Sequence, residues 1–312
     1  MRLFAKALRQ PFLQLRFKAA GVLVEVFERP GLWMDPGQLG DLSAALRQIA
    51  AATLPAGALD YGVFSGDAAR LAATTITLVR NPGTDRPIAF NALAHMTVET
   101  GQKSVEVTHL GLVMVDPGVR SQGLSWILYG LTCLLLFLRG GLRPRYVSNV
   151  TQVPAVVGMV AETFSEVVPT PQEPAPRDFR KILIAREIMA RHRHVFGVGP
   201  EAAFDDRHFI IRNAYTGGSD DLKKSFDAAA PHRRAVYNDW CRQVLDYDRG
   251  DDVLQIGLID LAAAQRYALR GVPRRSLAGL AVLGLMVALR RGIVPLLQWF
   301  DTARDFGRLR AR

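Results

Sequence analysis

The 312-residue sequence contains only two cysteines, Cys133 and Cys241, which lie far apart. Because no Cys-x-x-Cys pair occurs, the sequence predicts neither a disulfide framework nor a zinc finger. Long hydrophobic runs are also missing. The longest, Leu277–Leu289, ends at an arginine pair and is shorter than the roughly 20 residues that span a bilayer. We therefore expect no transmembrane helix and, since no unbroken apolar segment follows the basic start, no secretory signal.

Acidic residues are scarce, with 29 Asp and Glu against 39 Lys and Arg, which gives a net charge of +10. The excess gathers near the ends: the first acid is Glu25, and the tail contains Arg304, Arg308, Arg310 and Arg312. An anionic membrane surface or an acidic acyl carrier protein would suit this charge. The sequence does not favour nucleic acid as a partner, because no recognisable nucleic-acid module occurs.

The tail also contains an interrupted apolar stretch, Leu277–Phe300. Together with the basic ends, it suggests a cytoplasmic protein that docks at the inner membrane face without crossing. The alternative is that this stretch packs on the core as a buried helix pair.

Apolar residues make up 49% of the chain, enough for a sizeable core. Alternation and turn signals predict a run of strands: Val22–Phe27, Thr74–Arg80, Pro87–Glu99, Val105–Val115, Tyr146–Val150 and Arg207–Arg212. Helical patterns are found in Arg2–Lys18, from Asp35 to Ala51, in Leu124–Leu138, Pro154–Phe164 and Arg177–Phe196, and through most of the chain after Asp220, where no strong strand candidate occurs. We predict an α/β fold with three regions: a basic amphipathic segment (1–20), a core domain (21–215) and a helical C-terminal appendage (220–312).

One motif indicates chemistry. The strand ending at Val115 is followed by Asp-Pro-Gly and then by Arg120-Ser-Gln-Gly-Leu-Ser125 before a long apolar helix. A glycine turn that opens a helix leaves backbone N–H groups unpaired beside the positive end of the helix dipole, which favours a pyrophosphate.

This segment resembles the acyl-CoA-binding segment of the GNAT superfamily of N-acetyltransferases. That family places a (Gln/Arg)-x-x-Gly-x-(Gly/Ala) turn between its fourth strand and the next helix, and here Arg120, Gly123 and Ser125 occupy the three positions. Ser125 departs from Gly or Ala but remains small. The resemblance covers roughly residues 74–164, about a third of the chain.

The resemblance implies a mixed, mainly antiparallel sheet whose fourth and fifth strands splay apart around the pantetheine arm of coenzyme A or acyl-CoA. Those strands would be Leu110–Val115 and Tyr146–Val150. No metal is implied. The implied cofactor-binding residues are Leu112, Val113, Met114, Val115, Arg120, Ser121, Gln122, Gly123, Leu124, Ser125 and Asn149.

An amine must lose a proton before it attacks a thioester, so a base or a water relay is required. His109 is the first candidate, because many family members carry a catalytic Glu at this place and an imidazole titrates near neutrality. A histidine satisfied by hydrogen bonds inside the sheet is the alternative. Glu106 and His95 are weaker candidates. The family's tyrosine on the helix after the fifth strand has no counterpart in Pro154–Phe164, and no spacing selects Tyr129, Tyr146 or Tyr215 instead.

Three functions fit these features. The first is an acyltransferase that moves an acyl group from acyl-CoA to an amine of a small molecule or peptide. The second is a long-chain N-acyltransferase that takes its donor from acyl carrier protein, as the N-acyl amino acid synthase branch does. The third is a non-catalytic GNAT-like binding module.

We expect Gly123→Asp to abolish coenzyme A binding without unfolding the protein, because the new carboxylate would lie against the phosphates. Calorimetric titration of the variant with coenzyme A tests this expectation. Unchanged affinity would disprove the placement of the pyrophosphate at residues 120–125.

Overall fold

The computed structural model describes residues 10–53, 62–101, 103–119, 124, 126–171, 178–217 and 219–270, with isolated positions beyond. The strands are β1 (Gln14–Ala19), β2 (Val22–Glu28), β3 (Thr74–Arg80), β4 (Pro87–Thr100), β5 (Lys103–Val115), β6 (Arg145–Thr151), β7 (Ser165–Val168), β8 (Ala203–Asp205), β9 (Ile210–Arg212) and β10 (Asp252–Ile259). The α-helices are α2 (Pro36–Thr53), α3 (Ala68–Ala72), α4 (Thr132–Arg139), α5 (Pro154–Thr163), α6 (Phe179–Glu187), α7 (Ala235–Val244) and α8 (Leu261–Arg270).

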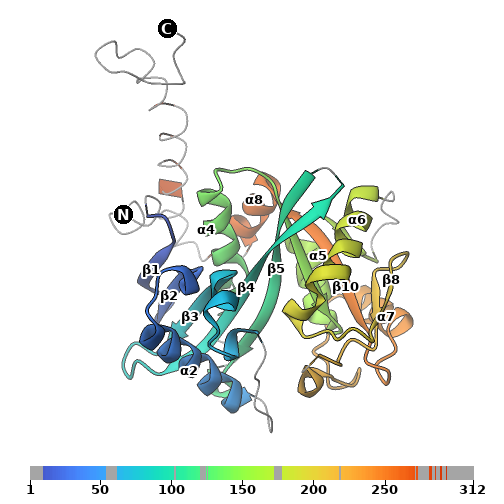
Figure 1. Ribbon diagram of the computed structural model, residues 1–312, viewed down its shortest axis with the longest axis horizontal. Helices are drawn as coiled ribbons and strands as arrows, with labels where there is room; N and C mark the ends of the chain where they lie inside the picture. Colours follow the sequence, from blue (N-terminus) through green and yellow to red (C-terminus); the bar gives the residue numbers. More distant parts are fainter. Residues whose placement is uncertain are drawn as a thin grey trace.

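All ten strands join one sheet in the order β1-β2-β3-β4-β5-β6-β10-β9-β8, with β7 pairing to β10 (Figure 1). The first five strands follow one another as an antiparallel meander. Strands β5 and β6 are the parallel pair at the centre, and β10 then pairs antiparallel with β6. The mainly antiparallel α/β class predicted from the sequence is confirmed.

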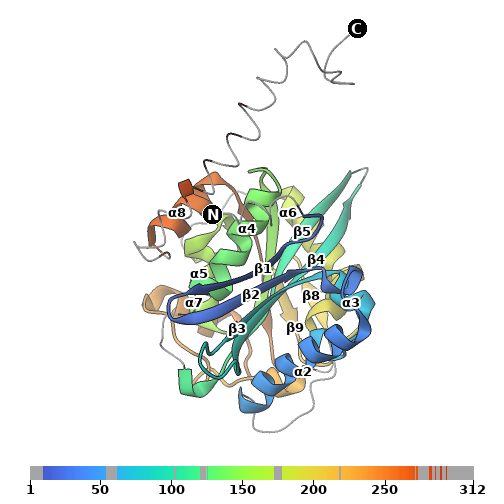
Figure 2. The same ribbon diagram turned by 90° about the vertical axis from the view of Figure 1, so that its left-hand side faces the viewer.

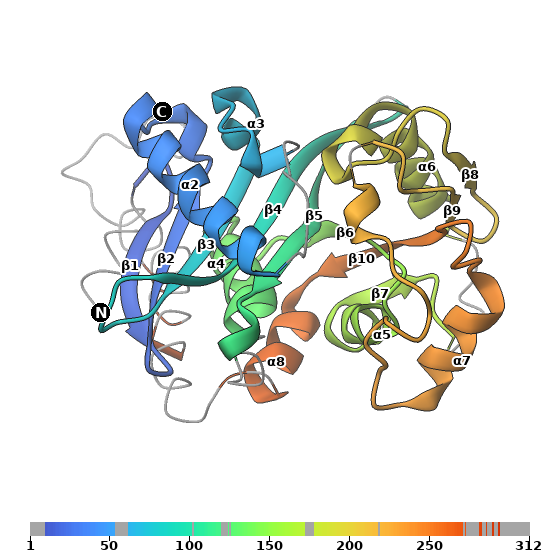
Figure 3. The same ribbon diagram turned by 90° about the horizontal axis from the view of Figure 1, so that it is seen from below.

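Helices cover both faces of the sheet. Helices α2, α3 and α6 lie on one face and α4, α5 and α8 on the other (Figure 3). Figure 2, in which the edge strands β1 and β2 face the viewer, shows α2 and α3 on one side of these strands and α4 and α8 on the other. The core beneath α2 gathers Leu46, Phe64 and Phe90, and the core beneath α4 gathers Ile127, Leu135 and Phe137. The sheet therefore separates two apolar layers, and access from one to the other requires a gap between strands.

Most of the expected elements of the central region are present. Strand β3 has the predicted bounds, β4 and β5 extend the predicted strands by one or two residues, and α2 and α5 begin near the predicted positions. The helix predicted over Leu124–Leu138 begins instead as a π-helix, Trp126–Leu131, which continues into α4.

Two expectations at the ends of the chain are wrong. Residues of the predicted Arg2–Lys18 helix form strand β1, at least from Gln14 onward, and residues 1–9 lie outside the described residues. The region after Asp220 is not purely helical, because it contributes β10 to the middle of the sheet. Nearly all of Leu277–Phe300 lies outside the described residues.

A β-bulge in β5 lies two residues beyond His109, the last residue of β5 that pairs with β6. Asn91 of β4 pairs with Val113 and Leu93 pairs with Leu110, so β5 holds one extra residue at this place. Gly111 occupies the bulge, and a Cβ there would lie 2.3 Å from the carbonyl oxygen of Ala92. Only glycine fits this close approach without a shift of the backbone.

We expect Gly111→Ala to lower the free energy of unfolding by about 1–3 kcal/mol, because the added methyl overpacks the bulge. Gly40→Ala is the matched control: Gly40 lies within α2, and a Cβ there meets nothing within 4 Å. The same change should therefore stabilise by about 0.5–1 kcal/mol. Urea denaturation compares the two variants, and shifts of the same sign would contradict the assignment of the bulge.

Candidate functional site

The central strands β5 and β6 pair over only three residues. Val107 pairs with Tyr146, Thr108 with Val147 and His109 with Ser148, and beyond these pairs the two strands no longer pair with each other. Strand β5 stays joined to β4 and β6 stays joined to β10. The sheet thus opens between Leu110–Met114 and Asn149–Thr151, with His109 and Ser148 at the vertex of the opening.

A cavity of about 640 Å³ occupies this opening. On one face it reaches Tyr129 and Val156, which pack against the core beneath α4. On the other face it reaches Phe64 and Phe196, which belong to the cores beneath α2 and α6. Because its walls include side chains from both layers, the cavity passes through the sheet.

Several residues expected to bind the cofactor line this cavity, namely Leu112, Val113, Met114 and Asn149. Val115 and Leu124 are not among the lining residues, and Leu124 is buried in the core beneath α4. Residues Arg120, Ser121, Gln122, Gly123 and Ser125 lie outside the described residues. Asn149 is buried and donates from Nδ2 to Gln255 Oε1 at 3.3 Å, so its amide is already engaged with β10.

His109 lines the cavity from the vertex of the opening. Its Nδ1 lies 3.1 Å from Ser148 Oγ, and its ring stacks on Phe196 with 4.9 Å between centroids. Burial lowers the pKa of His109 to about 4, because desolvation disfavours the imidazolium. The expectation that this imidazole titrates near neutrality is therefore wrong, and His109 is neutral at physiological pH.

The two weaker candidates for the base differ in position. His95 lines the cavity, hydrogen-bonds through Nε2 to Thr75 Oγ1 at 2.8 Å, and has its pKa lowered to about 4, chiefly by burial. Glu106 is exposed, is not among the cavity residues, and forms an ion pair with Arg145. Of the three tyrosines considered, Tyr129 and Tyr215 line the cavity and Tyr146 does not.

Sequence reasoning missed Asp252, a buried acid that lines the cavity at the start of β10. By strand alternation its side chain faces the same way as Leu254 and Ile256, which pack in the core beneath α6. Tyr215 donates its hydroxyl to Asp252 Oδ1 at 3.0 Å. Burial raises the pKa of Asp252 to about 7, against the opposing effect of the Tyr215 hydrogen bond. The sequence does contain a signal for strand β10, namely the alternating residues after Asp251-Asp252. The expectation of helix after Asp220 concealed this signal.

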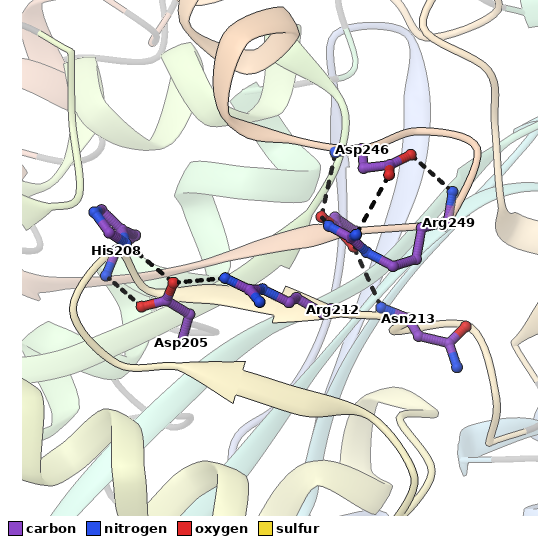
Figure 4. Close-up of polar contacts among 7 residues, drawn as sticks. Asp205, His208, Arg212, Asn213, Asp246 and Arg249 are labelled. Carbon is purple, nitrogen blue, oxygen red and sulfur yellow. Dashed lines mark hydrogen bonds and ion pairs between the residues drawn. The ribbon is translucent and has the colours of Figure 1, made fainter.

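The backbone that positions Asp252 is fixed by its neighbour Asp251, which is only 1% exposed. The Asp251 carboxylate accepts two hydrogen bonds from the Arg249 guanidinium, at 2.8 and 2.6 Å, and further bonds from the backbone N–H groups of Asn213 and Asp246. Figure 4 shows how this network ties the turn containing Asp246 and Arg249 to the end of β9. An ion pair of Asp205 with Arg212 and a hydrogen bond of Asp205 with His208 Nδ1 stiffen the β8–β9 hairpin beside it.

Comparison with known proteins gives no assignment: no family model matches the chain, and no curated protein gives a significant match. Among the described residues, no group of three or more His, Cys, Asp or Glu side chains is placed to hold a metal ion. In the same part of the chain, no helix has the length and apolar character needed to cross a membrane.

We expect the two titrations at the cavity to change stability in opposite directions with pH. Folded Asp252 keeps its proton up to about pH 7, while an unfolded Asp loses it near pH 4, so rising pH destabilises the folded wild type across this window. Asp252→Asn should therefore become more stable relative to wild type as the pH rises from 4 to 7.

His109 provides the control of opposite sign. The unfolded imidazole binds a proton below about pH 6.5, but the folded one does so only near pH 4, so falling pH destabilises the wild type. His109→Gln should gain relative to wild type as the pH falls through this window. Urea denaturation at several pH values measures both differences, and a flat profile for Asp252→Asn would show that its carboxyl titrates normally.

Proposed function

We propose that this protein is an acyltransferase that binds an acyl thioester in the opening between β5 and β6 and transfers the acyl group to an amine. The observation that supports this most directly is the cavity that passes through the sheet where these two strands separate. It lies beside the bulge at Gly111, on the strand that precedes in sequence the Arg120–Ser125 segment, which resembles the GNAT pyrophosphate site.

The strands that border the opening suit a pantetheine arm. Backbone groups of β5 and β6 that face the opening have no strand opposite them, so the amides of a pantetheine can pair with them as a partial strand would. Apolar side chains such as Leu110, Leu112 and Met114 provide the walls for the arm and the acyl chain. The phosphopantetheine of an acyl carrier protein has the same arm, so the carrier-dependent reaction is the alternative that the same opening accommodates.

In the proposed reaction the amine nitrogen attacks the thioester carbonyl carbon, a C–N bond forms and the C–S bond breaks. The products are an amide and a thiol. An ammonium group must first give one proton to a base, and the second proton leaves the nitrogen and ends on the departing thiolate sulfur.

Asp252 suits the role of base better than His109 does. A base works best when its pKa is near the operating pH, and that of Asp252 is about 7 while that of His109 is about 4. We assign His109, at the vertex beside the bulge, the role of a neutral hydrogen-bonding group near the thioester.

We expect coenzyme A to bind the full chain and to lose this binding in Leu112→Trp, because a large side chain on β5 would fill the opening. Leu32→Trp is the matched control, since Leu32 is 54% exposed and does not line the cavity. Calorimetric titration of the three proteins with coenzyme A measures the effect. Equal affinity of the wild type and Leu112→Trp, or no binding by the wild type, would contradict the donor site; binding of holo-acyl carrier protein alone would support the alternative.

A further inference from the structure

A buried acid without a cationic partner lines the cavity on the α6 face. Asp252 is 5% exposed, and Tyr215 is the one group among the described residues that hydrogen-bonds to its side chain. The bond is made to Oδ1, and among the described residues no Lys or Arg is found to form an ion pair with the carboxylate. A buried carboxylate in this state is unfavourable unless a cation approaches it.

The neighbouring acid shows how a buried carboxylate is usually stabilised. Asp251 is also buried, yet it is held by a bidentate pair with Arg249 and by two backbone N–H groups. The fold thus gives the carboxylates of these two consecutive aspartates different partners. Asp251 is satisfied from within the protein, while Asp252 faces a cavity that a ligand can enter.

The surroundings of Asp252 define the ligand's chemical class. The walls of the cavity on this face are largely apolar and aromatic, including Phe64, Phe196 and Val198. A ligand that fits both the buried carboxylate and the apolar walls has a protonated amino group and an alkyl or aryl body. We propose that Asp252 and Tyr215 form the binding site for the amino group of such an amine, with the carboxylate of Asp252 accepting from the ammonium.

This site deepens the proposed function, on which its role in catalysis rests. The amine would reach the thioester from the α6 face, while the donor extends along β5. Once the amine is bound, the Asp252 carboxylate takes one ammonium proton and becomes a neutral carboxyl, which leaves the nitrogen lone pair free to attack.

The pH dependence of amine binding follows from the groups around Asp252. Tyr215 hydrogen-bonds to it, Asp251 adjoins it, and burial raises the pKa of the nearby Tyr247, whose phenol stays protonated. The other titratable groups that line the same cavity are Arg70, His95, His109, Tyr129, His194, Asp221 and Lys224. An ammonium binds the ionised carboxylate, and alkylamines stay protonated below about pH 10. Affinity should therefore rise with pH as Asp252 loses its proton.

The test uses n-hexylamine as the probe, with 1-hexanol as its neutral counterpart, titrated calorimetrically into the full chain without coenzyme A. We expect hexylamine to bind about tenfold tighter at pH 8 than at pH 6, because the ionised fraction of a carboxyl with a pKa of about 7 rises by that factor. Hexanol should show no such dependence. Asp252→Asn should weaken hexylamine binding and abolish its pH dependence.

Tyr215→Phe provides a second variant that keeps the carboxylate. Loss of the hydroxyl removes a hydrogen bond that favours the ionised form, so the midpoint of the pH dependence should move to higher pH. Equal hexylamine affinity in wild type and Asp252→Asn, equal affinity for hexanol and hexylamine, or no binding at all would overturn the site. If the protein binds hexylamine but does not bind coenzyme A, the proposed amine site stands and the proposed acyltransferase function is contradicted.

Discussion

The central constraint on this structure is that a sheet must pair its backbone polar groups, and here the pairing stops in the middle of the sheet. After three parallel pairs, β5 and β6 separate while each remains joined to its other neighbour. Unpaired backbone groups inside a sheet are costly unless water or a ligand satisfies them. The bulge at Gly111 helps to create the separation, because an extra residue bends β5 and increases its local twist. An opening of this kind persists only where the strands on both sides are firmly held, as they are here by the β1–β4 meander and by β10.

The electrostatics of the cavity follow from the same opening. Burial holds His95 and His109 in their neutral forms and holds a proton on Asp252 up to near neutral pH. The same desolvation therefore lowers the pKa of the two histidines and raises the pKa of the acid, and of these three groups it brings Asp252 into the range where proton transfer occurs at pH 7. The Asp251–Arg249 network contributes by fixing the backbone at the start of β10, so that Asp252 is presented to the cavity rather than paired within the turn.

The sequence predicted the elements that depend on local residue patterns and missed those that depend on contacts between distant segments. Alternation between Thr74 and Val115 and the Asn81–Asp85 turn predicted the β3–β4–β5 meander, and Pro154 marked the start of α5. The apolar residues of Gln14–Ala19 also fit helical spacing, and only pairing with β2 makes them a strand. Strand β10 gains its place from β6, more than a hundred positions earlier, so no local pattern could put Asp252 at the cavity. The sequence placed His109 on the correct strand, but its pKa depends on burial in the folded chain, where its ring stacks on the distant Phe196.

In the proposed reaction, the single carboxyl of Asp252 would both bind the amine and accept its proton. In the proposed reaction the ionised carboxylate binds the ammonium, and the proton that it then accepts is the one that blocks attack. A carboxyl with an ordinary pKa would bind the cation but would hold the proton too weakly, whereas one raised much above 7 would be protonated already and could not bind it. The Tyr215 hydrogen bond opposes the effect of burial, and so sets the balance between these limits. Burial and this one hydrogen bond together, rather than the identity of the acid alone, would therefore determine whether the proposed site can bind and deprotonate an amine at neutral pH.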